Sequence, residues 1–220
     1  MAEKNRKPER RRDRPRRLPE PDNATLGTVD LLLDGAVLED ICFNQLDLAG
    51  RGIASIRGYN LVFDRVSFAN CEIALLQLFD ARLIGCDLSN TMLRAFEATR
   101  VEFIDCKLTG LNAFACRLED VLIDRSDARF AQLSEGRLRR SEIISSDLSE
   151  AALNGMTFEA TQLKNVILRK ADLADANLSG FDLTTCDIAA ISLRAQDLRG
   201  AIVTPAQAMD LARFLELVIR

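Results

Sequence analysis

Aspartates at a regular spacing are the residues of this sequence that could best support chemistry. Five of them recur at one fixed spacing or its double, and these are Asp47, Asp87, Asp127, Asp147 and Asp187. Carboxylates can act as general acids or bases, but that work needs a concave, desolvated setting. Because the sequence contains no histidine, mechanisms that use an imidazole as base, acid or metal ligand are excluded.

Six cysteines raise the question of a metal site or disulfides. Five share the first position of the repeat described below, and these are Cys71, Cys86, Cys106, Cys116 and Cys186, whereas Cys42 falls outside it. No CxxC spacing occurs, and free cysteine is commonly buried as a small apolar residue. We therefore expect packed cysteines, no metal site and no cofactor.

An enzyme is also not indicated by the other residue patterns. Neither a nucleophile–base pair nor a phosphate-binding glycine loop is recognisable. We expect a protein that is not an enzyme and takes no small-molecule substrate.

The sequence is organised by a repeat of five residues. The stretch ADLADANLSGFDLTTCDIAA, residues 171–190, divides into four such units, each with a large aliphatic third residue and Asp or Asn in the second position. In the same phase, 33 units begin between residues 36 and 196, and the third residue is Leu, Ile or Phe in 29 of them. The exceptions are Gly58, Ala98, Ala113 and Ala128.

A period of five fits neither an α-helix nor a plain strand. Within a unit, positions one and three point the same way in extended backbone, and positions four and five can turn the chain. Seven glycines fall at position five, where a corner can need a positive φ: they are Gly35, Gly50, Gly85, Gly110, Gly155, Gly180 and Gly200. Stacked turns would pair in parallel ladders about 4.8 Å apart.

These units resemble the pentapeptide-repeat family, whose consensus is roughly A-[DN]-L-x-x, and the resemblance covers residues 31–203. It implies an all-β solenoid, a right-handed four-sided β-helix with four units per turn and about eight coils, followed by a short C-terminal α-helix. Residues four units apart would then stack. One inner column would be Phe43, Phe63, Leu83, Phe103, Ile123, Ile143, Leu163 and Leu183.

Local departures from the repeat lead to two expectations about packing. Where the third residue is small, the first is often large, as with Phe96 before Ala98 and Ile56 before Gly58, which indicates volume compensation in a close-packed core. Residues 51–60 place Arg51 in an inward position and Gly58 in a central one. We expect a distorted or frayed turn there.

The two ends of the chain differ from the repeats. Residues 1–20 hold nine Lys or Arg and four acids, and residues 1–30 are predicted to be a disordered basic arm and lead-in. The arm is interpreted either as a solubilising tail or as a contact for nucleic acid or another anionic surface. The sequence has no run of 18 apolar residues, so we expect no membrane span and a cytoplasmic protein.

Residues 204–220 are predicted to form a helix that covers the last coil, because a stack of coils leaves unpaired strand edges at its ends. Thr204 is the expected N-cap, Pro205 the first helical residue and Gln207 the reciprocal capping partner. Capping and joining a second copy into a homodimer both remain open as roles of this helix. The candidate cap or dimer residues are Leu211, Phe214, Leu215 and Val218.

Two faces of the predicted solenoid are candidate interaction surfaces. An apolar set that should point outward on one side comprises Val62, Ile84, Ile104, Leu122 and Ile144, and such a column would suit a protein partner. The five regularly spaced aspartates form a candidate acidic face. The working hypothesis is a non-enzymatic protein-interaction scaffold with an unknown protein partner.

The family resemblance also implies a more specific alternative. Some members, the fluoroquinolone-resistance and mycobacterial gyrase-binding proteins, resemble B-form DNA and occupy the DNA site of type II topoisomerases, so DNA gyrase is a candidate partner. A duplex of about 40 Å carries roughly 23 negative charges, whereas residues 36–200 hold 24 acids and 18 bases. A basic cluster that opposes uniform mimicry comprises Arg117, Arg137, Arg139 and Arg140.

Overall fold

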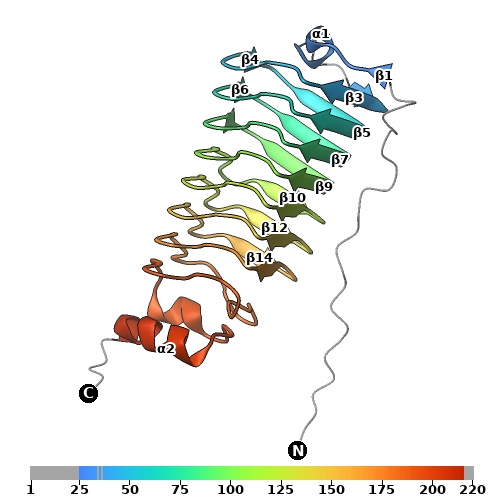
Figure 1. The fold of residues 1–220 in the computed structure, drawn as a ribbon. Coiled ribbons are helices and arrows are strands. Elements are labelled where there is room, and N and C mark those ends of the chain that lie inside the picture. Colours follow the sequence, from blue (N-terminus) through green and yellow to red (C-terminus); the bar gives the residue numbers. More distant parts are fainter. Residues whose placement is uncertain (1–24, 34, 36, 216–220) are drawn as a thin grey trace, which may run out of the picture.

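The structure is a computed structural model that describes residues 25–33, 35 and 37–215. The chain winds into a parallel β-solenoid of about seven turns, in which successive coils stack along one axis (Figure 1). This confirms the predicted all-β solenoid. The count is close to the eight or so coils expected from the repeat.

The strands form two parallel sheets along the sides of the solenoid. The larger, twelve-stranded sheet contains β1 (Thr25–Leu26), β2 (Val37–Glu39), β3 (Ile41–Asn44), β5 (Ile56–Asp64), β7 (Leu76–Ile84), β9 (Phe96–Ile104), β10 (Arg117–Glu119), β11 (Leu122–Asp124), β12 (Arg137–Arg139), β13 (Glu142–Ile144), β14 (Thr157–Glu159) and β15 (Gln162–Lys164). The smaller sheet contains β4 (Gly52–Ile53), β6 (Glu72–Ile73) and β8 (Met92–Leu93). Isolated bridges such as Asp182↔Ile202 continue the pairing beyond β15.

The register between coils is four repeat units, as the repeat predicts. In the predicted inner column, Phe43 pairs with Phe63, and each later member down to Leu163 pairs with its neighbour in the same way. Every member of the column, Leu183 included, is buried. The rings of Phe43 and Phe63 stack with centroids 5.1 Å apart. The inward direction of position three is therefore confirmed.

Most corners of the coils use left-handed backbone at position five. All seven glycines expected to have positive φ do so. Many residues other than glycine also have positive φ at position five, among them bulky ones such as Arg65 and Phe130. A left-handed conformation costs an L-residue roughly 1–2 kcal/mol. The ladder opposes this cost, because the N–H of Arg65, for example, donates to the carbonyl of Ile84 at 2.8 Å.

The expectation of a distorted turn over residues 51–60 is wrong. This stretch contains the regular strand β4 and the start of β5. Arg51 is exposed and does not enter the core. Gly58 fits because Leu61 occupies its space: a Cβ on Gly58 would lie 2.3 Å from Leu61 Cδ1. The volume missing at Gly58 is thus filled by the first residue of the next unit.

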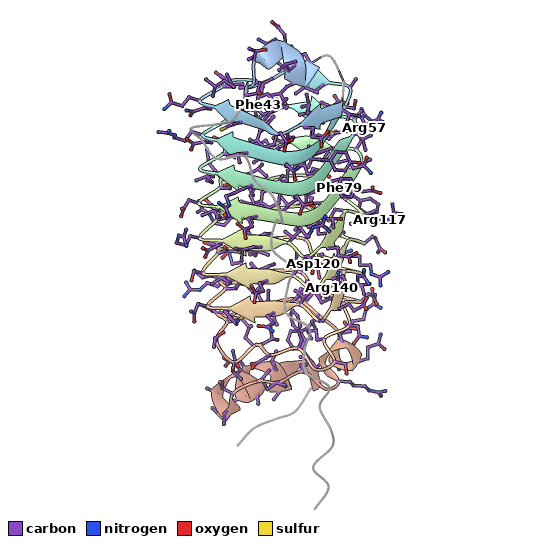
Figure 2. The ribbon with its side chains drawn as sticks, turned by 90° about the vertical axis from the view of Figure 1, so that its right-hand side faces the viewer. Phe43, Arg57, Phe79, Arg117, Asp120 and Arg140 are labelled. Atoms are coloured by element: carbon purple, nitrogen blue, oxygen red, sulfur yellow. The ribbon has the colours of Figure 1, made fainter. Side chains whose placement is uncertain are left out.

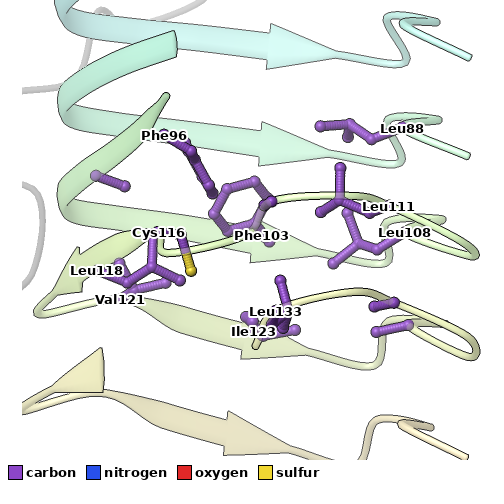
Figure 3. Packing of buried hydrophobic residues seen from close by; sticks show 14 of the residues in the cluster. Leu88, Phe96, Phe103, Leu108, Leu111, Cys116, Leu118, Val121, Ile123 and Leu133 are labelled. Carbon is purple, nitrogen blue, oxygen red and sulfur yellow. The ribbon is translucent and has the colours of Figure 1, made fainter. Parts of the chain in front are cut away.

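Volume compensation is also visible deeper in the core. Phe96 is buried beside the small Ala98, and its ring packs edge-on against Phe103 with centroids 6.3 Å apart. Figure 3 shows the rings of Phe96 and Phe103 next to each other among the buried residues of the solenoid. The large Phe96 thus compensates for the small Ala98 in the same unit.

A short helix covers the first coil, which the sequence did not predict. Helix α1 (Val29–Leu33) buries Leu32 completely and packs Val29, Leu31 and Leu33 against the core. Strand β1 precedes it and pairs with β3. The predicted lead-in and the first residues of the predicted solenoid therefore form an N-terminal cap. So short a helix offers too little of an amphipathic period to be recognised in the sequence. The basic residues 1–20 lie outside the described residues.

The C-terminal helix begins as predicted. In α2 (Pro205–Leu211), the Thr204 hydroxyl accepts from the N–H of Gln207 at 3.2 Å, and the Gln207 side chain accepts from the N–H of Thr204 at 2.8 Å. Gln207 Nε2 also donates to the carbonyls of Leu183 and Cys186, at 2.8 and 3.0 Å. The helix thereby caps carbonyls at the end of the solenoid.

The remaining C-terminal residues are only partly described. Short 3₁₀ turns, η1 (Ala195–Leu198) and η2 (Ala212–Leu215), flank α2. Leu211 is buried and Phe214 packs half-buried against the core. The side chain of Leu215 and all of Val218 lie outside the described residues. That this helix also joins two copies stays a prediction.

The register can be tested at Leu118. Its side chain is buried and pairs in register with Ala98 and Leu138, so Leu118→Asp would place an uncompensated charge in the core. We expect a loss of at least about 3 kcal/mol in the free energy of unfolding, measured by chemical denaturation. Gln132→Asp on an exposed position is the control and should change stability by less than about 0.5 kcal/mol. Equal stability of the two variants would show that the register is wrong.

The packing of Gly58 gives a second test. Gly58→Ala should destabilise the protein by about 1–3 kcal/mol through overpacking against Leu61. Leu61→Ala opens the same space, so the double variant should be less destabilised than the sum of the two single variants. Gly52→Ala is the matched control, because nothing lies within 4 Å of an added Cβ there. Strict additivity in thermal or chemical unfolding would contradict this explanation.

Candidate functional site

The five regularly spaced aspartates do lie in one column. Parallel bridges connect Asp47 to Ser67 and continue down the solenoid to Asp187. Ser67, Lys107 and Ile167 occupy the other places in the column. The column is therefore interrupted and is not continuously acidic.

Each of these aspartates helps to form a corner. Its Oδ1 accepts a hydrogen bond from the backbone N–H two residues further on, the arrangement known as an Asx-turn. The distances are 2.9 Å to Ala49, 2.8 Å to Ser89, 3.1 Å to Arg129, 2.8 Å to Ser149 and 3.1 Å to Ala189. The second position thus has a structural role at every coil where one of these carboxylates occurs.

Several of these carboxylates are also paired with cations. Asp127 binds Arg129 at 2.7 Å and Asp187 binds Arg169 at 2.6 Å. The hydrogen bond from the Arg129 side chain holds the pKa of Asp127 below its usual value. Paired charges of this kind lower the net negative potential that a DNA-like surface would need.

Mimicry of DNA toward gyrase stays a prediction, as does binding through the basic arm.

The predicted apolar face is divided between two columns. Val62 and Leu122 belong to one, in which Arg82 and Glu102 separate them. The neighbouring column contains Ile84, Ile104 and Ile144, with Asp124 between the last two. All five apolar residues are half-buried. They lie on the same side, as predicted, but they do not form a continuous apolar strip.

The cysteines are packed in the core, as the sequence predicted. All six are free and buried. The thiols of Cys71, Cys86 and Cys106 each donate to a backbone carbonyl of the preceding coil, at 2.9, 3.4 and 3.5 Å. Burial raises the pKa of the Cys116 thiol to about 12. These thiols are packed in the core, which is not a setting for a reactive thiolate.

A different side of the solenoid carries the most distinctive surface, which we call the arginine–aromatic face. It consists of two outward columns on β5, β7, β9, β10 and β12. The first column is Arg57, Gln77, Glu97, Arg117 and Arg137, and the second is Tyr59, Phe79, Thr99, Glu119 and Arg139. In Figure 2, Arg57, Phe79 and Arg117 follow one another along one edge of the solenoid.

This face contains a hollow of about 410 Å³. Its lining residues come from four adjacent strands and are Phe79, Glu97, Thr99, Arg117, Leu118, Glu119, Arg137 and Arg139. It lies where the long strand β9 gives way to the shorter β10 and β11 in the next coil. The hollow is open to the outside and combines an aromatic wall with charged rims.

Ion pairs between coils hold the charged rims in place. Arg117 Nη1 lies 3.0 Å from Glu97 Oε1, and Arg137 lies 2.5 Å from Glu159. Glu119 receives hydrogen bonds from both Arg139 and Arg140. Partial burial opposes ionisation of Glu119, but these two guanidinium groups outweigh it and lower the pKa of its carboxyl. Glu119 therefore stays charged at neutral pH.

The remaining arginine of the predicted basic cluster, Arg140, is anchored at the adjacent corner. Arg140 contacts Asp120 at 2.6 Å, and the Asp120 side chain is almost fully buried. Figure 2 shows this pair beside the arginine–aromatic face. The sequence indicated the cluster of arginines but did not assign it to a site. Aligning residues that lie four units apart in the sequence would have shown that the aromatic residues lie beside this arginine cluster.

Comparison with known families bears on the repeat itself. Residues 146–184 match the family model for pentapeptide repeats, in eight copies. The same five-residue phase, with left-handed backbone at most of its fifth positions, extends from Asp40 to Gly200. This chain is a pentapeptide-repeat protein. No curated protein matches it in sequence.

Solved structures of pentapeptide-repeat proteins are similar to it at low sequence identity. HetL from the cyanobacterium Nostoc sp. strain PCC 7120, involved in the regulation of heterocyst differentiation, is 18% identical, with 77% of this chain and 86% of HetL covered and a TM-score of 0.37. Full-length QnrB1, a plasmid-mediated fluoroquinolone resistance protein, is 14% identical, with 80% and 100% covered and a TM-score of 0.36. Rfr23 from the cyanobacterium Cyanothece 51142 is 17% identical, with 56% and 88% covered and a TM-score of 0.24. Sequence identities and TM-scores as low as these do not allow a function to be transferred from these proteins to this pentapeptide-repeat protein.

Two further observations concern the described part of the chain. Among residues 25–33, 35 and 37–215, no group of three or more Cys, Asp or Glu side chains is arranged to hold a metal ion. Within those same ranges, no helix has the length and apolar character needed to cross a membrane.

The Asx-turns make stability depend on pH. The hydroxyl and N–H of Thr184 both donate to Asp182 and lower the pKa of its carboxyl. Because the folded pKa lies below the unfolded value of about 3.9, this group stabilises the fold above about pH 4, and the stabilisation is lost as the pH falls through the folded pKa. The urea midpoint should therefore fall between pH 5 and pH 2.5.

Two variants isolate this contribution. Asp182→Asn keeps an oxygen acceptor without a titrating group, as Asn177 already does toward the N–H of Ser179, so its midpoint should depend less on pH. Asp182→Ala should lower the midpoint at every pH. The same pH slope in Asp182→Asn and in the parent protein would exclude a contribution from Asp182.

Proposed function

We propose that this pentapeptide-repeat protein is a non-enzymatic interaction scaffold that binds another protein through its arginine–aromatic face. The observation that supports it best is the hollow between Phe79 and Arg139. Arginine and aromatic residues are enriched at protein–protein interfaces and among the residues that dominate binding energy.

The rigidity of the solenoid favours this role. The outward side chains of the arginine–aromatic face stand on parallel ladders in which every coil pairs with the next. Ion pairs hold the long side chains of Arg117 and Arg137. Side chains held in this way lose less conformational entropy when a partner binds, which favours affinity.

Site-specific photo-cross-linking in cells tests the proposal. A photoreactive amino acid replaces Thr157, which is exposed and follows Arg137 in register on β14. The matched control carries it at Gln132, which is also exposed but belongs to another column. We expect a discrete protein adduct from position 157 that is absent from position 132, identified by mass spectrometry. The same adducts from both positions, or none from position 157, would contradict the proposal.

A further inference from the structure

The aromatic column on the arginine–aromatic face stops abruptly at Thr99. Tyr59 and Phe79 are paired in register, and their rings are stacked with centroids 5.0 Å apart and an interplanar angle of 10°. The next residue in register is Thr99, which has no ring to continue the stack. Phe79 and Thr99 both line the hollow, so a slot of one coil's height remains beside the Phe79 ring.

The charged groups around this slot are arginines and glutamates in nearly equal number. Arg117, Arg137 and Arg139 line it together with Glu97 and Glu119. Arg117 contacts Glu97 through Nη1, and its side chain is 77% exposed. The other edge of this guanidinium group therefore faces solvent and can receive a second carboxylate, because guanidinium carries five donors.

We propose that the slot receives an aromatic side chain of a partner protein, and that a carboxylate next to that side chain in the partner pairs with Arg117. This rests on the proposed function, for which it names the partner's chemistry. An inserted ring continues the stack at the same spacing, because adjacent coils lie about 4.8 Å apart and stacked aromatic pairs prefer centroids roughly 4.5–7 Å apart.

The charges favour a protein side chain over a nucleotide or nucleic acid. A phosphate dianion at the slot would meet the carboxylates of Glu97 and Glu119 as well as the arginines. Binding to nucleic acid is driven by the neutralisation of many phosphates, whereas the arginines here are already engaged by Glu97, Glu119 and Glu159. A single carboxylate beside a ring adds one negative charge and suits one exposed guanidinium edge.

Fluorescence polarisation with labelled peptides tests the slot. The probes are peptides with a single Asp next to Xaa and with Gly-Ser flanks, in which Xaa is Tyr, Phe or Trp. A matched peptide has Ala in place of Xaa, and another has Asn in place of Asp. We expect the best aromatic probe to bind at least about tenfold more tightly than either matched peptide. Equal affinity for the Ala peptide would overturn the proposal.

Variants of the protein locate the binding. Thr99→Phe fills the slot with the chain's own ring and extends an existing stack, so the thermal midpoint should be kept while the affinity falls at least about tenfold. Arg117→Gln should weaken binding about fivefold or more. Arg94→Gln changes an exposed arginine that pairs with Glu72 of the smaller sheet, away from the arginine–aromatic face, and should leave binding unchanged. Unaltered binding to a folded Thr99→Phe variant would overturn the proposal.

Two further readouts separate the alternatives. If Thr99→Phe does not fold, Phe79→Ala removes the aromatic wall and should weaken binding comparably, and unchanged binding would count against the slot. Tighter binding of a labelled oligonucleotide than of any aromatic peptide would replace the protein partner by a nucleic acid. If cross-linking from position 157 persists in Thr99→Phe, the scaffold function stands and the slot does not contribute.

Discussion

The parallel hydrogen-bonded ladder between coils is the constraint on which the rest of this molecule depends. It repeats every four units, and it can do so only if every coil has the same length and turns its corners at the same places. The corners therefore adopt left-handed backbone even where the residue is an arginine, a phenylalanine or an alanine. An isolated turn would not hold such residues in this conformation, but each corner here is fixed by the coils on either side.

The ladder also decides what the polar residues do. Aspartates at the second position accept from backbone N–H groups in the corner, so their regular spacing reflects the geometry of the turn and not a shared ligand. Arginines and acids one coil apart pair across the ladder, as Arg100 does with Asp80 at 2.6 Å. Surface features that are specific to this chain are therefore found where a column changes its residue type, as at Thr99.

Much of the fold could be predicted from the sequence because each coil repeats the preceding one and pairs only with its two neighbours. A fixed phase of five places the third residue of each unit inward. The inner column from Phe43 to Leu183 follows from that phase alone. The regularity of residues 51–60 could not be predicted, because Gly58 is compensated by Leu61 across a corner. Helix α1 was missed since so short a segment carries too little periodicity. The hollow depends on side-chain length in neighbouring columns, which composition and spacing do not describe.

Helix α2 has a consequence for the length of the stack of coils. A stack of parallel coils has no intrinsic length, because the last coil presents the same backbone groups as every coil before it and could accept a strand from another molecule. Gln207 places its amide on the carbonyls of Leu183 and Cys186, which a further coil would otherwise approach. Helix α1 buries Leu32 at the opposite end. The two helices thus cover the backbone groups at both ends of the stack and oppose the addition of further coils.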